Sequence, residues 1–182
     1  MNKVRHKCFI SYHHDDQAEV DEFISTFDDE RDVLIARGLG QEMAQDIINS
    51  DDTAYVMRRI RELYLKDSTV TIVLMGRCTW ARRYVDWEIQ ASLRHGSVVT
   101  PNGLLGIKLP SYSERDGQYP NRLNVNLKQN DDQEDCYARS IAYPSRKDTL
   151  ANAIDAAFDR RQTHEKWINN PRERFLNNRS CS

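Results

Sequence analysis

The chain lacks the features that mark membrane, secreted or nucleic-acid-binding proteins. It has no apolar run near the roughly 18 residues that a membrane-spanning helix needs. Its start, MNKVRHKCFIS, has too few apolar residues for a secretory signal. The formal net charge is -2, so no overall positive field attracts DNA, RNA or anionic lipid. We therefore expect neither nucleic acid nor a membrane among its partners.

Clustered cysteines and histidines are also missing. Cys8, Cys78, Cys136 and Cys181 are scattered without a CxxC pair, and no two histidines stand at HxxxH spacing. Disulfide scaffolds and zinc ribbons both require clustering. We therefore expect four reduced thiols, as in the cytoplasm, and no metal site. Glycine-rich phosphate loops are absent as well, because no GxGxxG or Walker pattern occurs.

What is present is the composition of one globular domain. The 182 residues are 39% apolar and 30% charged, which is enough to bury a substantial core. Short apolar runs, typical of buried parallel strands, alternate with segments whose apolar residues recur at helical spacing. This alternation predicts an α/β fold, a parallel sheet flanked by helices. Strands are expected at residues 7–12, 32–36, 70–75, 104–109 and 137–143.

Two segments stand apart from this pattern. Residues 110–135 are polar and show no periodicity, so we expect a long loop there. Residues 166–182 are polar and rich in asparagine and arginine. We expect them to form a loosely attached tail behind a domain of residues 1–165.

The most informative segment runs from the third expected strand into the helix that follows it. The strand Val70–Met75 stops at Gly76, and a polar loop leads into a helix that carries Glu88. Open α/β sheets bind ligands beyond the carboxyl ends of their strands. Glu88 therefore follows the strand where a ligand would lie. On a helical wheel Glu88 falls with Tyr84 at the border of the apolar face.

The other faces of this helix are assigned by the same periodicity. Val85, Ile89 and Leu93 define the side that packs on the sheet. Trp87 lies off this side, which favours a contact with another protein. The polar residues expected to face water are Arg83, Asp86, Gln90 and Arg94.

Two interpretations of Glu88 follow from its border position. In the first, the carboxylate is partly desolvated, is directed along the sheet, and has a pKa set by burial and a few donors. In the second, Glu88 forms an ordinary surface ion pair with Arg82, Arg58 or Arg59. Spacing alone favours the second interpretation, because structural ion pairs outnumber catalytic carboxylates.

The end of the first strand supplies polar residues beside this helix. In a parallel sheet, the turn after Ser11 lies next to the loop after the third strand, so Gly76, Thr79 and Glu88 can face it. Ser11 lies where a ligand would approach. The alternative is purely structural, with acidic residues capping the next helix and solvated histidines beside them. The residues of that turn are Tyr12, His13, His14, Asp15 and Asp16.

Three segments together resemble a known family. FISYHHDD at Phe9–Asp16, TVTIVLMG at Thr69–Gly76 and RRYVDWEI at Arg82–Ile89 are similar to the TIR-like domains typified by the Thoeris antiphage TIR proteins. The resemblance covers residues 7–109 and continues weakly to about residue 161. In TIR domains the last motif is W-C-x-x-E, whose glutamate cleaves NAD. Here Tyr84 and Val85 replace the tryptophan and the cysteine, and Glu88 keeps the glutamate position.

The resemblance implies a flavodoxin-like parallel sheet of about five strands with helices on both faces. It also implies an NAD glycohydrolase or ADP-ribosyl cyclase that breaks the nicotinamide–ribose bond, with Glu88 as the catalytic residue. NAD is then the substrate, and no cofactor or metal is implied. A loop at residues 38–51 would close over the pocket. The implied substrate-binding residues are Phe9, Ser11, Tyr12, His13, Gly76, Thr79 and Tyr84.

The implied partners are other proteins, reached in two ways. TIR-like domains act after self-association, for which Trp87 and the loop at residues 110–135 are the candidate contacts. In Thoeris relatives a cyclic ADP-ribose isomer then activates a separate effector protein. Whether this chain makes a cyclic product, linear ADP-ribose or a conjugate is left open by its residues.

Two non-enzymatic alternatives share this sheet. A TIR-like scaffold would act through protein contacts alone, because a fold does not fix a function. A phospho-accepting receiver domain would use Asp15 and Asp16 to hold magnesium. Receivers carry their phospho-accepting aspartate at the end of the third strand, however, and this chain has Gly76 there. Release of nicotinamide from NAD distinguishes the enzyme from both.

Overall fold

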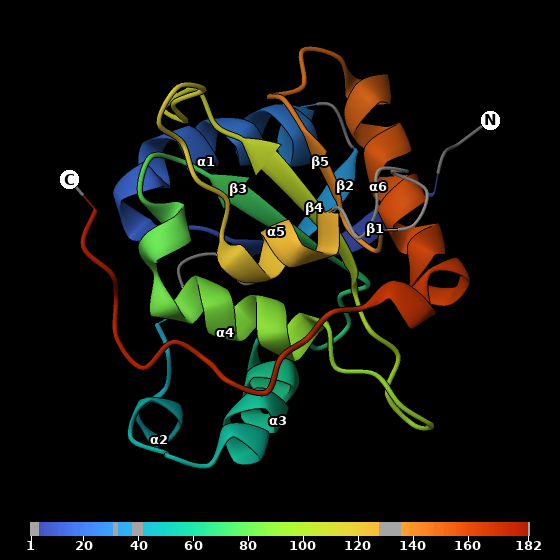
Figure 1. The fold of residues 1–182 in the computed structure, drawn as a ribbon. Helices are drawn as coiled ribbons and strands as arrows, with labels where there is room; N and C mark the ends of the chain where they lie inside the picture. The colour runs from blue at the N-terminus through green and yellow to red at the C-terminus, as the bar shows by residue number, and fades with distance from the viewer. Residues whose placement is uncertain (1–3, 31–32, 38–41, 128–135, 182) are drawn as a thin grey trace.

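One parallel sheet organises the protein. A computed structural model describes residues 4–30, 33–37, 42–127 and 136–181. The sheet order is β2–β1–β3–β4–β5, and every neighbouring pair is parallel. This order is that of the flavodoxin-like fold, so the predicted fold class is confirmed (Figure 1). The strands are β1 (His6–Ser11), β2 (Leu34–Arg37), β3 (Val70–Met75), β4 (Gly103–Lys108) and β5 (Arg139–Ile141).

Helices connect these strands on both faces of the sheet. None of the helices in the described ranges is long and apolar enough to cross a bilayer. The helices are α1 (Gln17–Ile24), α2 (Gln45–Ile48), α3 (Thr53–Leu63), α4 (Arg83–Ser92), α5 (Asn121–Leu127) and α6 (Lys147–Thr163). Short turns of other helix types are η1 (His14–Asp16), η2 (Ser25–Glu30), η3 (Thr79–Ala81) and η5 (Glu165–Trp167).

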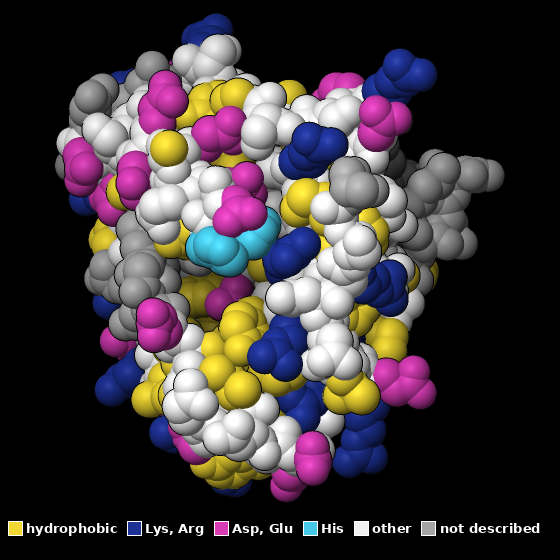
Figure 2. Space-filling view, turned by 90° about the vertical axis from the view of Figure 1, so that its left-hand side faces the viewer, with side chains coloured by type: hydrophobic (Ala, Val, Ile, Leu, Met, Phe, Trp, Pro, Cys, Tyr) yellow, Lys and Arg dark blue, Asp and Glu magenta, His cyan; other side chains and the backbone are white. Residues whose placement is uncertain are grey.

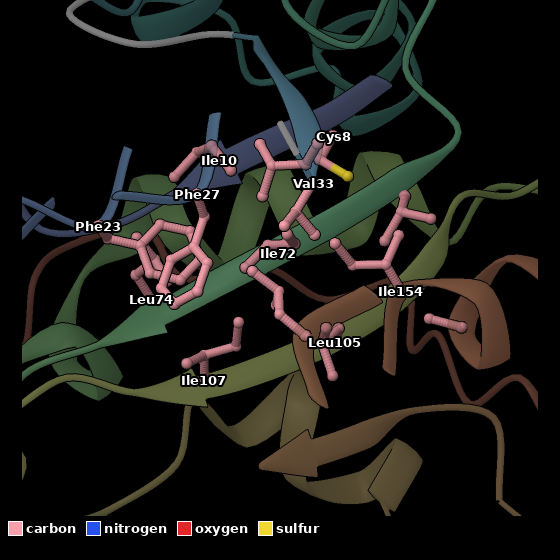
Figure 3. Packing of buried hydrophobic residues seen from close by; sticks show 14 of the residues in the cluster. Cys8, Ile10, Phe23, Phe27, Val33, Ile72, Leu74, Leu105, Ile107 and Ile154 are labelled. Atoms are coloured by element: carbon pink, nitrogen blue, oxygen red, sulfur yellow. The ribbon is translucent and has the colours of Figure 1, made fainter. Parts of the chain in front are cut away.

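One face of the sheet packs against α1, η2 and α6. Successive side chains of a strand point to opposite faces, so Cys8 and Ile10 of β1 share a face with Ile72 and Leu74 of β3. These residues contact aromatic side chains from α1 and η2 and aliphatic side chains from α6 (Figure 3). Each fully buried aliphatic or aromatic side chain contributes about 1.5–3 kcal/mol, so this core is a main source of stability. Its helical members are Val20, Phe23, Phe27, Leu150, Ile154 and Ala157.

The opposite face packs against α3, α4 and α5. Val73 and Met75 of β3 contact the side of α4 that carries Val85, Ile89 and Leu93, as its periodicity predicts. Phe9 and Ser11 of β1 point to this face as well, because they alternate with Cys8 and Ile10. The face therefore places the end of β1 directly beneath α4.

A glycine allows α6 to lie directly against the sheet. At Gly103, the first residue of β4, a side chain would collide with the main-chain carbonyl of Ala157 in α6. Backbone cannot move away cheaply, so only glycine allows this approach.

The segment expected as one long loop contains a helix. Residues 121–127 form α5, which buries Leu123 and Asn126 against the sheet and the end of the chain. The segment therefore supplies the helical crossover between β4 and β5 that parallel strands require. Residues 128–135 of the predicted loop lie outside the described residues.

The C-terminal segment is bound along α4, and the prediction of a loose tail is wrong. Figure 1 shows the chain after η5 running the length of α4 toward its beginning. Gln90 donates to the carbonyls of Pro171 and Arg172 at 3.1 and 3.0 Å, and the indole of Trp87 donates to the carbonyl of Phe175 at 2.7 Å. We call residues 169–181 the strap.

The strap buries the face of α4 that was expected to meet water. Asp86 is 5% exposed, Trp87 2% and Gln90 4%, so the predictions for these residues are wrong. Helical periodicity identifies the face that packs on the sheet. It does not show that a polar segment from far along the chain covers the other face.

Two cysteines join the strap to the loop after β3. Cys78 and Cys181 form a disulfide, whereas Cys8 and Cys136 are buried and are not disulfide-bonded. The expectation of four reduced thiols is therefore wrong for this pair. The pair is separated by 103 residues, so no local spacing pattern in the sequence could reveal it.

Candidate functional site

The candidate site is centred on a carboxyl group between β1 and α4. Oγ of Ser11 donates to Oε2 of Glu88 at 2.5 Å. Ser11 ends β1 and is fully buried, whereas Glu88 is half-buried in the middle of α4. The two residues are 77 positions apart in the sequence. The fold brings them together at the carboxyl edge of the sheet, where α/β proteins bind ligands.

Glu88 is not part of a surface ion pair within the described residues. Arg59 pairs with Asp46 at 3.1 Å, and Arg58 lies 3.8 Å from Glu62. Nε of Arg82 donates to the carbonyl of Cys78. The structure therefore favours the first interpretation of Glu88, a partly desolvated carboxyl group directed along the sheet.

Burial changes the acidity of this group. Desolvation raises the pKa of Glu88 from 4.5 to about 8, and the hydrogen bond from Ser11 opposes the rise. The carboxyl group is therefore largely neutral at pH 7 in the free protein. A nearby positive charge would return it to the ionised form. Such a strongly perturbed carboxyl group at the edge of a sheet is typical of functional sites.

His13 follows Ser11 by two residues and is buried, not solvated as the structural alternative predicted. Its ring is 4% exposed and packs edge-on against the ring of His14 at 4.4 Å. Desolvation lowers the pKa of His13, and the positive charge of Arg82 contributes to the decrease. The imidazole of His13 is therefore neutral at pH 7. His14, which extends into solvent, does behave as expected.

Three consecutive side chains form a group with metal-ligand character. One donor atom each from His13, His14 and Asp15 lies within 4.8 Å of the others. In the structure these groups contact one another, because the carboxylate oxygens of Asp15 lie 3.1 Å from Nε2 of His13 and 2.9 Å from Nε2 of His14. The absence of a functional metal stays a prediction, and the experiment below with a chelator tests it.

Asp16 connects the turn after β1 to the loop after β3. Oγ1 of Thr79 accepts from the main-chain N–H of Gly76 at 2.9 Å and donates to Asp16 at 3.3 Å. A side chain at Gly76 would collide with the Asp16 carboxylate. Asp16 therefore makes no capping hydrogen bond to α1, contrary to the structural alternative. Gly76 and Thr79 hold the two loops of the site together.

Two predicted site residues point away from Glu88 or lie beneath it. The hydroxyl of Tyr12 donates to Gln17 at 2.7 Å, and its ring packs with the α1–α6 core on the other face of the sheet. Phe9 is 1% exposed and packs under α4 with Trp87. Alternation along β1 explains both positions, because Phe9 and Ser11 share a face and Tyr12 does not.

Tyr84 lies one helical turn before Glu88 and is half-buried. Its ring meets the ring of Trp87 edge-on at 5.4 Å, and its hydroxyl accepts from Arg83 at 2.9 Å. Part of the loop expected to close over the pocket, residues 38–41, lies outside the described residues. The rest of that loop contains α2, whose Ile47 is buried against α3.

The surface around these residues is concave and charged. Figure 2 looks onto the side toward which β3 and β4 point in Figure 1. It shows a hollow with histidine side chains at its rim, an acidic side chain at its floor, and arginine or lysine side chains along one side. A hollow with an acid below and cations beside it fits a ligand that carries both signs of charge.

Sequence reasoning missed one polar residue that supports the site. Arg122 of α5 is 5% exposed, and its Nε donates to Asp86 of α4 at 2.9 Å. Other nitrogens of Arg122 donate to strap carbonyls at Pro171 and Glu173. No pattern in the sequence indicates this role, because α5 falls in a segment without periodicity.

Comparison with known proteins identifies the family. A family model described as Thoeris protein ThsB, TIR-like domain, matches residues 9–114. The match covers more than half of the chain, so the protein belongs to this family. A search of curated proteins found no match.

Proposed function

We propose that the protein is an NAD-consuming enzyme of antiphage defence that works in the cytoplasm. It cleaves the nicotinamide–ribose bond of NAD and makes an ADP-ribose signal, in cyclic form, for a separate effector protein. The observation that carries this proposal is the hydrogen bond from Ser11 to Glu88 at the carboxyl edge of β1. The family match supports it, because the glutamate lies inside the matched residues 9–114.

Cleavage of the nicotinamide–ribose bond requires one carboxylate beside the ribose. Loss of nicotinamide passes through a transition state with positive charge on the ribose. An ionised Glu88 beside that sugar stabilises the transition state more than the substrate, which is the requirement for catalysis. Nicotinamide leaves without protonation, so a second carboxylic acid, as in ordinary glycosidases, is unnecessary. The positive nicotinamide ring of bound NAD also favours the ionised form of Glu88.

The remaining residues of the site position the substrate or the loops. In this proposal Ser11 orients Glu88 while His13 and Tyr84 border the ribose and nicotinamide. Gly76 and Thr79 hold the loop after β3 through Asp16. Phe9 supports α4 from below, and Tyr12 contributes its main chain because its ring points to the other face.

The direct test is nicotinamide release. Purified protein is incubated at micromolar concentration with NAD, and the products are separated and identified by mass spectrometry. Free nicotinamide together with a product of ADP-ribose mass, or of that mass less water for a cyclic form, is expected. No release at any concentration tested would overturn the enzyme proposal and favour the TIR-like scaffold.

Activity is expected to depend on self-association. The predicted carrier of this contact, Trp87, is buried under the strap, so the contact must use another surface. Specific activity should rise steeply with protein concentration. Trp87→Ala should lower the melting temperature and leave the steepness of that rise unchanged. A specific activity that is high and constant from nanomolar to micromolar protein would show that a monomer suffices.

The pKa of Glu88 predicts the pH dependence. Because the free enzyme carries a carboxyl group with a pKa of about 8 and the ionised form is active, kcat/KM should rise tenfold per pH unit below 8 and level off above it. Ser11→Ala removes the hydrogen bond that favours ionisation, so its profile should shift to higher pH. A flat profile between pH 6 and 9 would contradict the assignment.

Catalysis should not require a metal. Treatment with EDTA is expected to leave nicotinamide release unchanged, and His14→Ala, at the exposed end of the histidine pair, should retain activity. Loss of activity with EDTA that magnesium or zinc restores would instead assign a metal to the group of His13, His14 and Asp15.

A further inference from the structure

The disulfide lies at the junction of the strap and the candidate site. Cys78 follows Gly76 by two residues and precedes η3, which leads into α4. Its partner Cys181 ends the strap, and the two Cα atoms are 5.7 Å apart. Both residues are partly exposed, so a reductant in solution can reach the bond. Cys8 and Cys136 are 0% and 1% exposed and cannot exchange with it in the folded protein.

The loop that carries Cys78 is held from two sides. On its inner side, Thr79 donates to Asp16 and accepts from Gly76. On its outer side, the disulfide fixes it to the end of the strap. Breaking the disulfide therefore removes the covalent outer restraint and leaves the inner one.

The strap also supplies the missing cap of α4. The N-cap residue of α4, Arg82, makes no side-chain capping hydrogen bond. Instead, the side chain of Asn178 accepts from the main-chain N–H of Arg83 at 3.0 Å. The N–H of Arg179 donates to the carbonyl of Ala81 at 2.8 Å. Helix ends need such partners, so the helix that carries Glu88 begins against a segment that the disulfide ties down.

The first half of the strap is held without the disulfide. Arg122 and Gln90 bind the carbonyls at Pro171, Arg172 and Glu173, and Asn170 donates to the carbonyl of Gln90. The disulfide therefore controls the end of the strap, residues 176–181, and not its beginning.

We propose that the Cys78–Cys181 disulfide is a redox latch on the candidate NAD site. A dithiol reductant attacks one sulfur through its thiolate, forms a mixed disulfide, and leaves as its own disulfide after its second thiol attacks. The chain gains two electrons and two protons and ends with two free thiols. The end of the strap then detaches, and the loop after β3 and the first turn of α4 loosen around Glu88.

The latch gives the protein a low-activity resting state. Disulfides of cytoplasmic proteins are mostly transient and redox-sensing, so the reduced form is the resting form in that compartment. Oxidation by a disulfide-class oxidant closes the latch and fixes Glu88 opposite Ser11. This direction of the effect on activity rests on the proposed function, whereas the structural effect of the latch does not.

The structural arm of the test uses hydrogen exchange and thiol alkylation on the full chain. Native protein treated with dithiothreitol should take up alkylating reagent at Cys78 and Cys181 alone. Amide exchange should accelerate in residues 77–84 and 176–181 and stay unchanged in residues 169–172. Equal exchange in the oxidised and reduced forms would overturn the latch, and so would four free thiols after treatment with oxidised glutathione.

The activity arm compares the same two forms with NAD. Reduction should lower kcat/KM about tenfold, since small misplacements of catalytic groups have effects of this order or larger, and reoxidation should restore it. Cys181→Ser should have the kcat/KM of the reduced protein, and neither reduction nor reoxidation should change that value. If exchange responds to reduction but neither form releases nicotinamide, the proposed function fails and the latch stands. Equal activity of both forms would overturn the latch as a switch of the site.

Discussion

Glu88→Gln should abolish NAD cleavage and leave the fold intact. Glutamine has nearly the volume of glutamate and keeps an oxygen that can accept the hydrogen bond from Ser11. It lacks the negative charge that stabilises the ribose cation in the transition state. Removing such a preorganised electrostatic contact lowers the rate on the order of 10³-fold. Nicotinamide release under conditions that activate the wild type measures the loss.

The same substitution should make the protein more stable at alkaline pH. The pKa of Glu88 is about 8 in the folded protein and 4.5 when exposed. Below pH 4.5 the group is neutral in both states and does not affect stability. As the pH rises toward 8 only the unfolded state ionises, so the wild type loses stability, and above 8 the loss is constant. Glutamine avoids this loss.

Thermal melting at pH 5 and pH 9 tests that expectation. The variant should melt close to the wild type at pH 5 and on the order of 10 °C higher at pH 9. The difference between a pKa of 4.5 and about 8 corresponds to roughly 4–5 kcal/mol, and about 1 kcal/mol moves the melting temperature of a domain of this size by about 2–4 °C. Glu62→Gln, an exposed acid with arginine partners, is the matched control and should show neither effect. Unchanged turnover in Glu88→Gln would exclude Glu88 as the catalytic residue.

The parts of the fold that the sequence predicted depend on local periodicity. The apolar run at Val70–Met75 predicts a buried strand, and the stripe of Val85, Ile89 and Leu93 predicts the helix face that packs on the sheet. The structure confirms both. Parallel strands that end at one edge then place Ser11 near the helix of Glu88 without further information. Alternation along β1 was equally readable. This alternation places Tyr12 and Ser11 on opposite faces of the sheet. Only the family resemblance assigned both residues to the substrate site.

The parts that could not be predicted depend on contacts between distant segments. The strap binds α4 largely through main-chain carbonyls, as at Pro171 and Phe175. Every residue has a main-chain carbonyl, so the amino-acid sequence does not indicate which ones accept these hydrogen bonds. Asp86 and Trp87 therefore resembled surface residues. The disulfide closes over 103 residues, and neither cysteine has a neighbour that signals its partner.

Arg122→Met should be the most destabilising substitution of a polar residue outside the candidate site. Arg122 and Asp86 are each 5% exposed, and Nε of Arg122 lies 2.9 Å from a carboxylate oxygen of Asp86. Asp86 also accepts from the N–H of Phe175 at 2.9 Å. Methionine keeps most of the volume but leaves Asp86 as a buried charge with one donor. Breaking a buried pair in this way costs about 3–5 kcal/mol.

Thermal melting and hydrogen exchange measure two parts of this effect. The melting temperature should fall on the order of 10 °C. Exchange should accelerate in residues 169–175, the half of the strap that reduction of the disulfide leaves unchanged. Arg58→Met, at an exposed i,i+4 pair with Glu62, is the control and should cost less than about 1 kcal/mol.

A double variant separates the unpaired charge from the lost hydrogen bonds. Asp86→Asn removes the charge and retains an oxygen that can accept from Phe175. If the isolated carboxylate causes most of the loss, Arg122→Met with Asp86→Asn should be more stable than Arg122→Met alone. If most of the lost stability comes instead from the carbonyls of Pro171 and Glu173, which lose their hydrogen-bond donor, the double variant should be no more stable than the single one. A melting temperature of Arg122→Met equal to that of the wild type would show that the strap stays bound without this arginine.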